Sequence, residues 1–145
     1  MRNALLFGGL ALVLATLNIS IVRKETLLAN GAVVLVELAP VDPRSLIQGD
    51  YMRLEYALTR VIDDPPDLPR DGAAVVKLDA RRVASFVRYH DSSPLQPGEL
   101  LLKFRKRARR VRVASDAYFF EEGSARKFEG ARFGELRVAP DGTSI

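Results

Sequence analysis

The predicted fold is decided by the segment AAVVKLDARRVASFVRYH, residues Ala73–His90. Two runs rich in β-forming residues, Ala73–Ala80 and Val83–His90, meet at the tight connection Asp79–Arg82. Runs of this length joined by a short polar turn are typical of an antiparallel β-hairpin. The centre of the chain therefore predicts a β-sheet domain.

Further strand-like segments lie on both sides of this hairpin and are separated by loops rich in proline, aspartate and glycine. They are Ala32–Leu38, Asp50–Leu58, Leu100–Phe104, Val111–Phe120 and Phe133–Val138. Within Asp50–Leu58 apolar and polar residues alternate, which predicts a strand with one buried face. Helical spacing of alanine and phenylalanine occurs at Ser124–Arg132, where we predict one short helix.

The N-terminal segment has no charged residue from Asn3 to Val22. As a helix this segment would span about 30 Å, the thickness of a hydrocarbon core. A cleaved signal peptide is the alternative, but the apolar run continues to Arg23 without a small-residue cleavage site. We therefore predict an anchor over residues 1–22 and a soluble domain over residues 23–145. The predicted fold class is mainly β: an N-terminal transmembrane helix followed by one compact antiparallel β domain with one short helix.

The charges that flank the anchor are nearly balanced, with Arg2 and the α-amino group on one side and Arg23 and Lys24 on the other. They therefore give almost no bias under the positive-inside rule. A short N-terminus ahead of an apolar helix most often stays in the cytoplasm. We accordingly predict an extracytoplasmic domain.

Composition excludes several kinds of chemistry. The chain has no cysteine and a single histidine, His90, so thiol catalysis and the usual zinc sites are excluded. It has no glycine-rich phosphate loop, and we predict neither a metal nor a cofactor. The net charge of +4 suits an anionic membrane surface or an acidic partner better than nucleic acid.

The segment GDYMRLEY, Gly49–Tyr56, holds the first candidate site. Leu54 and Tyr56 share the apolar face of the predicted strand, so core packing explains them. Gly49 fits a positive φ or a bulge where the chain enters the strand. Asp50 fits a turn in which its carboxylate accepts backbone N–H bonds.

Tyr51 falls on the polar face of the same predicted strand, beside Arg53. An aromatic ring between charged residues is not needed for the core and is typical of a recognition residue. Packing of the ring under a loop is the alternative.

The string G-D-Y-x-x-L-x-Y at Gly49–Tyr56 resembles the signature of the GDYXXLXY family of bacterial membrane-anchored proteins. The flanking segment Val36–Leu58 and the block Tyr118–Val138 are similar to the two characteristic blocks of this family, in the same order. The resemblance implies an inner-membrane anchor, an extracytoplasmic domain and an integral membrane protein as partner, and it implies no particular activity. Family members usually continue past the equivalent of Ile145 with another short strand, so we expect an open sheet edge near Phe133–Val138.

The second block concentrates carboxylates, with Glu121 and Glu122 as candidates for an acidic site and Arg132 close by in sequence. Paired carboxylates can perform acid–base chemistry if their surroundings separate their pKa values. Consecutive glutamates on a strand point to opposite sides, however, and Glu129 with Arg132 fits an ordinary surface ion pair. Both the structural and the functional interpretation stay open.

The segment KFRKRARRVRV, Lys103–Val113, predicts two strands joined around Lys106–Arg109, with the basic side chains on one outward face. The candidates for a basic surface are Arg105, Arg107, Arg110 and Arg112. A solvated face accounts for this pattern, and contact with anionic lipid head groups or an acidic partner is the functional alternative.

We expect an accessory protein of the bacterial envelope, without enzymatic activity, that docks onto a membrane or envelope partner. Its contacts would be the lipid bilayer and an integral membrane protein, with anionic lipid head groups as a further candidate, but no nucleic acid. The alternative is an extracytoplasmic enzyme or ligand-binding module that uses Asp50, Tyr51, Glu121 and Glu122. A closed pocket in which these side chains converge would favour that alternative.

Overall fold

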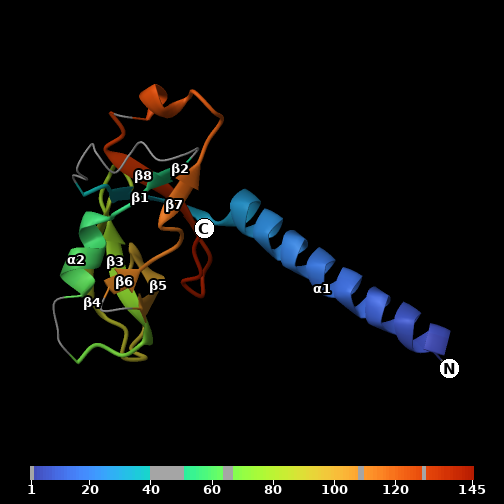
Figure 1. The fold of residues 1–145 in the computed structure, drawn as a ribbon. Coiled ribbons are helices and arrows are strands. Elements are labelled where there is room, and N and C mark those ends of the chain that lie inside the picture. The colour runs from blue at the N-terminus through green and yellow to red at the C-terminus, as the bar shows by residue number, and fades with distance from the viewer. Residues whose placement is uncertain (1, 40–50, 64–66, 108–109, 129) are drawn as a thin grey trace.

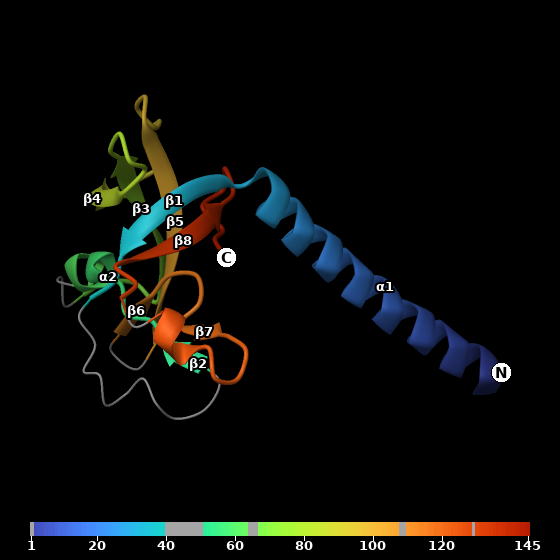
Figure 2. The same ribbon diagram turned by 90° about the horizontal axis from the view of Figure 1, so that it is seen from above.

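The computed structural model describes residues 2–39, 51–63, 67–107, 110–128 and 130–145 (Figure 1). Its first element is helix α1, Arg2–Asn30, which points away from the rest of the chain in both views (Figures 1 and 2). The stretch Leu6–Asn30 is long and apolar enough to cross a membrane. The helix continues eight residues past Val22, where the sequence predicts the anchor to end.

Several polar side chains of α1 form hydrogen bonds within the helix. Four of them donate a hydrogen bond of 2.8–2.9 Å to the carbonyl four residues earlier: Thr16, Asn18, Ser20 and Thr26. A hydrocarbon environment offers no partner to a polar group, so an internal bond is what a lipid-facing helix requires. The apolar side chains of α1 are exposed along its length, among them Phe7 and Leu12.

The rest of the described chain is mainly β, as predicted. Its strands are β1 (Ala32–Glu37), β2 (Tyr51–Arg53), β3 (Asp71–Leu78), β4 (Ala84–Tyr89), β5 (Glu99–Arg107), β6 (Arg110–Arg112), β7 (Ala117–Phe119) and β8 (Phe133–Val138). The helical pieces are α2 (Ala57–Ile62) and the 3₁₀ turn η2 (Ala125–Lys127). The strands form a four-stranded antiparallel sheet in the order β4-β3-β5-β6 and two antiparallel pairs, β1-β8 and β2-β7.

The central hairpin predicted from Ala73–His90 is confirmed as β3 and β4. Its turn is held by Asp79, whose carboxylate accepts bonds of 2.8 Å from the backbone N–H groups of Arg81 and Val83. Arg82 completes the turn in the left-handed region, with φ 64°. The aspartate provides the local hydrogen bonds that a tight turn needs.

The hydrophobic core lies between the β1-β8 pair and the four-stranded sheet, with α2 at one side (Figure 2). Its largest fully buried side chains are Val34, Val36, Ile62, Val75, Val76, Leu102 and Val113. Val34 and Val36 alternate with partly exposed residues along β1, which is the pattern of a strand with one buried face. Burial of these side chains is the main term that stabilises the domain.

The prediction of one strand over Asp50–Leu58 is wrong for its second half. Strand pairing ends at Arg53, Tyr56 forms an isolated bridge with Leu38, and α2 begins at Ala57. Leu58 and Ile62 then lie one helical turn apart, and both are buried. A spacing of four residues suits one face of a helix as well as one face of a strand, so the apolar pattern alone did not separate the two.

The prediction of a helix over Ser124–Arg132 is also wrong, because the described part of this segment contains only the 3₁₀ turn η2. Phe128 instead packs on Tyr118 and Phe120, with ring centroids 5.2 and 5.3 Å apart. These aromatic contacts fold the segment back as a series of turns. The short helix of the domain is α2, which begins at the end of the first family block.

The expected open edge at Phe133–Val138 is wrong for its C-terminal half. One side of β8 pairs with β1 along the whole strand. On the other side, Arg137 exchanges two backbone hydrogen bonds of 3.0 and 3.1 Å with Ile145. The turn at Gly142 therefore returns the chain onto β8 and covers this part of its edge.

Candidate functional site

Tyr56 joins the two segments that build the candidate site. Its side chain is 4% exposed, and its hydroxyl donates a 2.9 Å hydrogen bond to the carbonyl of Ser115. Burial of the phenol, followed by the nearby charge of Asp116, raises the pKa of Tyr56 to about 12. Leu54 packs against the same core. The predicted core positions of Leu54 and Tyr56 therefore agree with the structure.

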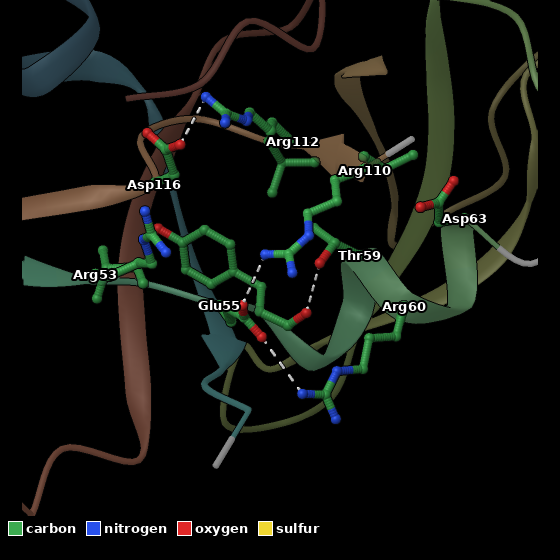
Figure 3. A pocket seen from close by; sticks show the side chains of 12 residues that line it. Arg53, Glu55, Thr59, Arg60, Asp63, Arg110, Arg112 and Asp116 are labelled. Atoms are coloured by element: carbon green, nitrogen blue, oxygen red, sulfur yellow. Dashed lines mark hydrogen bonds and ion pairs between the residues drawn. The ribbon is translucent and has the colours of Figure 1, made fainter. Parts of the chain in front are cut away.

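A hollow of about 370 Å³ lies between the segment β2–α2 and strand β6 (Figure 3). We call it the first hollow. Its charged lining consists of four arginines and three carboxylates: Arg53, Arg60, Arg110, Arg112, Glu55, Asp63 and Asp116. Backbone pairing fixes the wall opposite β6, since the N–H of Ala39 donates a 2.7 Å bond to the carbonyl of Glu55.

Glu55 is shared by two arginines of the first hollow. Its carboxylate oxygens lie 3.2 Å from a terminal nitrogen of Arg110 and 3.4 Å from one of Arg60. In Figure 3 the side chain of Arg110 reaches from β6 toward Glu55, and that of Arg60 bends back from α2 to the same carboxylate. One negative charge therefore serves two guanidinium groups.

The other two carboxylates of the first hollow have cations of their own. Asp116 pairs with Arg112 at 2.7 Å, and Asp63 pairs with Lys106 at 3.0 Å. Arg53 is exposed and has no ion pair with any described residue. The hollow thus contains an arginine whose charge is not balanced by a described carboxylate.

A second, more open hollow of about 720 Å³ adjoins the first, because Arg112 and Asp116 line both. Its charged residues also include Asp71, Lys103, Arg105 and Arg107. We call the charged lining of the two hollows the basic face. It contains seven cations and four carboxylates: Arg53, Arg60, Lys103, Arg105, Arg107, Arg110, Arg112, Glu55, Asp63, Asp71 and Asp116.

The predicted basic hairpin is present as β5 and β6. Arg105 pairs with Arg112 and Arg107 with Arg110 across the two strands, so the four side chains share one face of the sheet. Leu102, Phe104, Val111 and Val113 are buried on the opposite face. The register therefore confirms the predicted orientation. Carboxylates within the described chain pair with three of these arginines, including Asp71 with Arg105 at 2.6 Å.

The remaining motif residues are placed as follows. Gly49 and Asp50 lie outside the described residues. Tyr51 begins β2, where its backbone is opposite Phe119 of β7. Pairing of these strands brings the first family block next to the second.

The acidic candidates lie away from both hollows. Glu121, Glu122 and Arg132 are exposed and line neither of them. Within the described ranges, no group of three residues of metal-binding type is placed to hold an ion. The acidic block therefore contributes nothing to the geometry of the basic face.

Sequence reasoning missed the carboxylates and the helix residue that complete the first hollow, namely Glu55, Arg60, Asp63 and Asp116. Two of these residues lie in or near a segment that the sequence already marks: Glu55 is part of the GDYMRLEY string, and Arg60 follows Glu55 by five residues. Their partners, however, are distant in sequence. Glu55 and Arg110 are 55 positions apart, so the fold has to be known before this ion pair can be recognised.

Chemically, the first hollow is suited to binding negative charge. Arginine stays protonated at physiological pH and presents several N–H donors in a planar fork that matches carboxylate or phosphate oxygens. The walls are held together by the Tyr56–Ser115 hydrogen bond, and the ion pairs with Glu55 orient Arg60 and Arg110. Such preorganisation lowers the cost of binding.

Comparison with models of known families gives a match to the description "GDYXXLXY protein" over residues 13–145. Searches of curated proteins and of solved structures gave no match. The matched range includes most of α1, the Gly49–Tyr56 string and the second block with β7 and β8. Because the match covers nearly the whole chain, the chain belongs to the GDYXXLXY family.

Proposed function

We propose that this protein is a single-pass accessory protein of the bacterial envelope. Its α1 helix spans the inner membrane, and its domain docks through the basic face onto an acidic surface of an integral membrane protein. The domain lies on the extracytoplasmic side. The protein assembles with its partner and does not catalyse a reaction.

The charge distribution is the observation that carries this proposal. The basic face has seven cations against four carboxylates, an excess of three. The whole chain has a net charge of +4. Most of the formal charge imbalance of the protein is therefore gathered on one surface. A surface of this kind steers and orients an oppositely charged partner.

Helix α1 supports the membrane part of the proposal. Its apolar side chains are exposed, and its internal polar groups bond to its own backbone. Gly31 then leads directly into β1, and its N–H donates a 2.8 Å bond to Leu27 of the helix. A tether this short keeps the domain at a high effective concentration near membrane partners, so that weak contacts suffice for docking.

The proposal is tested with the full-length protein, purified from its native membranes in a neutral detergent. We expect a membrane protein to co-purify at low salt and to be released at about 0.5 M NaCl, where charges are screened over a few ångströms. Arg105→Gln/Arg107→Gln should abolish this association. Arg107 has no ion pair among the described residues, and Arg105 pairs only with exposed Asp71, so little stability is lost.

The matched control is Arg81→Gln/Arg82→Gln. It removes the same charge from the β3–β4 turn, at the opposite end of β3 from Arg105 according to the strand register. The control should retain the partner. If the same membrane proteins co-purify with both variants and with the unmodified protein, docking through the basic face is excluded.

A further inference from the structure

We propose that the first hollow is a binding site for a phosphate group, presented either by a phospholipid head group or by a soluble phosphorylated ligand. This inference goes beyond the proposed docking function. It concerns a small-ligand site within the basic face and does not require a protein partner.

Arg53 is the first arginine of the hollow with free donors. It is exposed, it lines the hollow, and no described carboxylate pairs with it. Figure 3 shows Arg53 on the opposite side of the hollow from Arg60. All five N–H donors of its guanidinium are therefore available to an incoming anion within the described structure.

Glu55 leaves its two arginine partners with further donors. Arg60 and Arg110 each contact this single carboxylate through one terminal nitrogen, at 3.4 and 3.2 Å. Each guanidinium keeps further N–H donors that no described acceptor uses. An anion can bind these donors without breaking either ion pair with Glu55.

The other two carboxylates of the first hollow do not neutralise its remaining positive charge. Asp116 is already neutralised by Arg112 at 2.7 Å and Asp63 by Lys106 at 3.0 Å. In Figure 3, Arg112 points away from Arg110 and toward Asp116. The charge left over in the hollow comes from Arg53 and from the pair Arg60 and Arg110, which share one glutamate.

The donor count favours phosphate over carboxylate. A carboxylate presents two oxygens, whereas a phosphate presents three or more and can therefore accept hydrogen bonds from more guanidinium groups at once. Arg53, Arg60 and Arg110 line the first hollow with N–H donors that no described acceptor uses. The volume of about 370 Å³ lies within the usual range for small-ligand sites.

The binding test uses the full chain in neutral-detergent micelles at constant ionic strength. Isothermal titration is carried out with inorganic phosphate and with glycerophosphoglycerol, the head group of phosphatidylglycerol. We expect saturable binding of at least one probe. Arg53→Gln should weaken it by about tenfold or more, as expected for loss of a charge-assisted hydrogen bond.

Two further variants separate a site from general charge attraction. Arg53→Lys keeps the charge but loses the planar fork, so binding should also weaken. Arg81→Gln removes one charge from a distant turn and should leave the affinity unchanged. Since Arg53 makes no ion pair with a described residue, its variants should retain the melting temperature of the unmodified protein.

The two probes identify the source of the phosphate. Binding of the head group alone indicates a lipid ligand, and binding of inorganic phosphate alone indicates a soluble one; either result supports the site. The inference is overturned if neither probe binds saturably up to about 10 mM, or if Arg53→Gln and Arg81→Gln weaken binding equally. Failure here leaves the docking proposal standing, because that test depends on Arg105 and Arg107.

Discussion

The hydroxyl of Tyr56 donates a 2.9 Å hydrogen bond to the carbonyl of Ser115, across 59 positions of sequence. Tyr56 ends the family string, and Ser115 lies three residues before the second family block begins at Tyr118. Their contact fixes the segment β2–α2 against the segment that follows β6. The last tyrosine of the string therefore has a structural role, which is to hold the two walls of the first hollow together.

Replacing Tyr56 with phenylalanine should destabilise the domain by about 1–2 kcal/mol. The variant keeps the ring in the core but removes the donor to Ser115, which leaves a carbonyl without its partner. Thermal unfolding followed by circular dichroism measures the effect. Tyr118→Phe is the control, since Tyr118 is exposed and its hydroxyl makes no hydrogen bond to a described residue.

Tyr56 should also make the protein sensitive to alkali. Burial raises its pKa to about 12 in the folded state, whereas an unfolded tyrosine titrates near 10. The folded state therefore holds the proton more tightly, and stability is lost as pH rises from about 10 to about 12. Tyr56→Phe should flatten this part of the stability–pH curve. An unchanged alkaline slope would contradict the assignment.

A pair of glycine variants tests the C-terminal turn. Gly142 has φ +84°, and a Cβ there would lie 3.0–3.2 Å from atoms of Leu101 and Lys103. Gly98 has φ +83° with nothing within 4 Å of such a Cβ. Gly98→Ala should lower the free energy of unfolding by about 1 kcal/mol, because alanine is strained in the left-handed region. Gly142→Ala should cost about 2–3 kcal/mol, because the methyl group must also displace β5.

Equal losses for the two variants, measured by thermal or chemical unfolding, would contradict this packing of the turn against β5. The same comparison tests how residues 143–145 cover the edge of β8, since Gly142 directs the chain onto that edge.

Asp141 should make a small contribution to stability that depends on pH. A 2.6 Å contact from Lys103 and hydrogen bonds from Thr143 lower its pKa to about 2, below the usual aspartate value of about 4. Its stabilisation is therefore present above about pH 4 and is lost as pH falls toward about 2. Asp141→Asn should lower stability at pH 7 by about 0.5–1 kcal/mol, the range for exposed pairs.

The difference between Asp141→Asn and the unmodified protein should shrink as the solution is acidified from pH 5 toward about pH 2. Asp67→Asn is the control, because Asp67 is exposed and pairs with no described residue. A gap in melting temperature that stays constant across this range would show that Asp141 does not act through its charge.

A topology reporter decides on which side of the membrane the domain lies. Alkaline phosphatase joined after Ile145 through a flexible linker should be active, because it folds only outside the cytoplasm. A fluorescent protein at the same position, exported in unfolded form, should stay dark. The reverse pattern would place the domain in the cytoplasm and exclude the extracytoplasmic part of the proposed function.

Strands and hairpins were predictable from the sequence because their signals are local. The β3–β4 hairpin follows from two apolar runs around Asp79, and the basic hairpin follows from charged and apolar residues that alternate along β5 and β6. Helix α2 was missed for an equally local reason. Its N-cap is Tyr56, which makes no side-chain capping bond, so the usual serine, threonine or aspartate signal is absent.

The first hollow was not predictable, because it depends on contacts between distant segments. Glu55 meets Arg110 across 55 positions, and Asp63 meets Lys106 only after α2 and β5 have packed. The sequence singled out Arg53, Arg110 and Arg112 by their side of a strand. It could not show that carboxylates pair with Arg110 and Arg112. Arg53 differs from them because it has no ion pair with a described residue.

Site-specific photo-cross-linking in living cells tests the central claim most directly. A photoreactive amino acid replaces Arg107 on the basic face or, as the matched control, Arg81 at the opposite end of β3. If the basic face docks onto an integral membrane protein, position 107 should give one discrete adduct with a membrane protein, and position 81 should give none. Equal adducts from both positions, or an adduct from position 81 alone, would contradict the proposed docking surface.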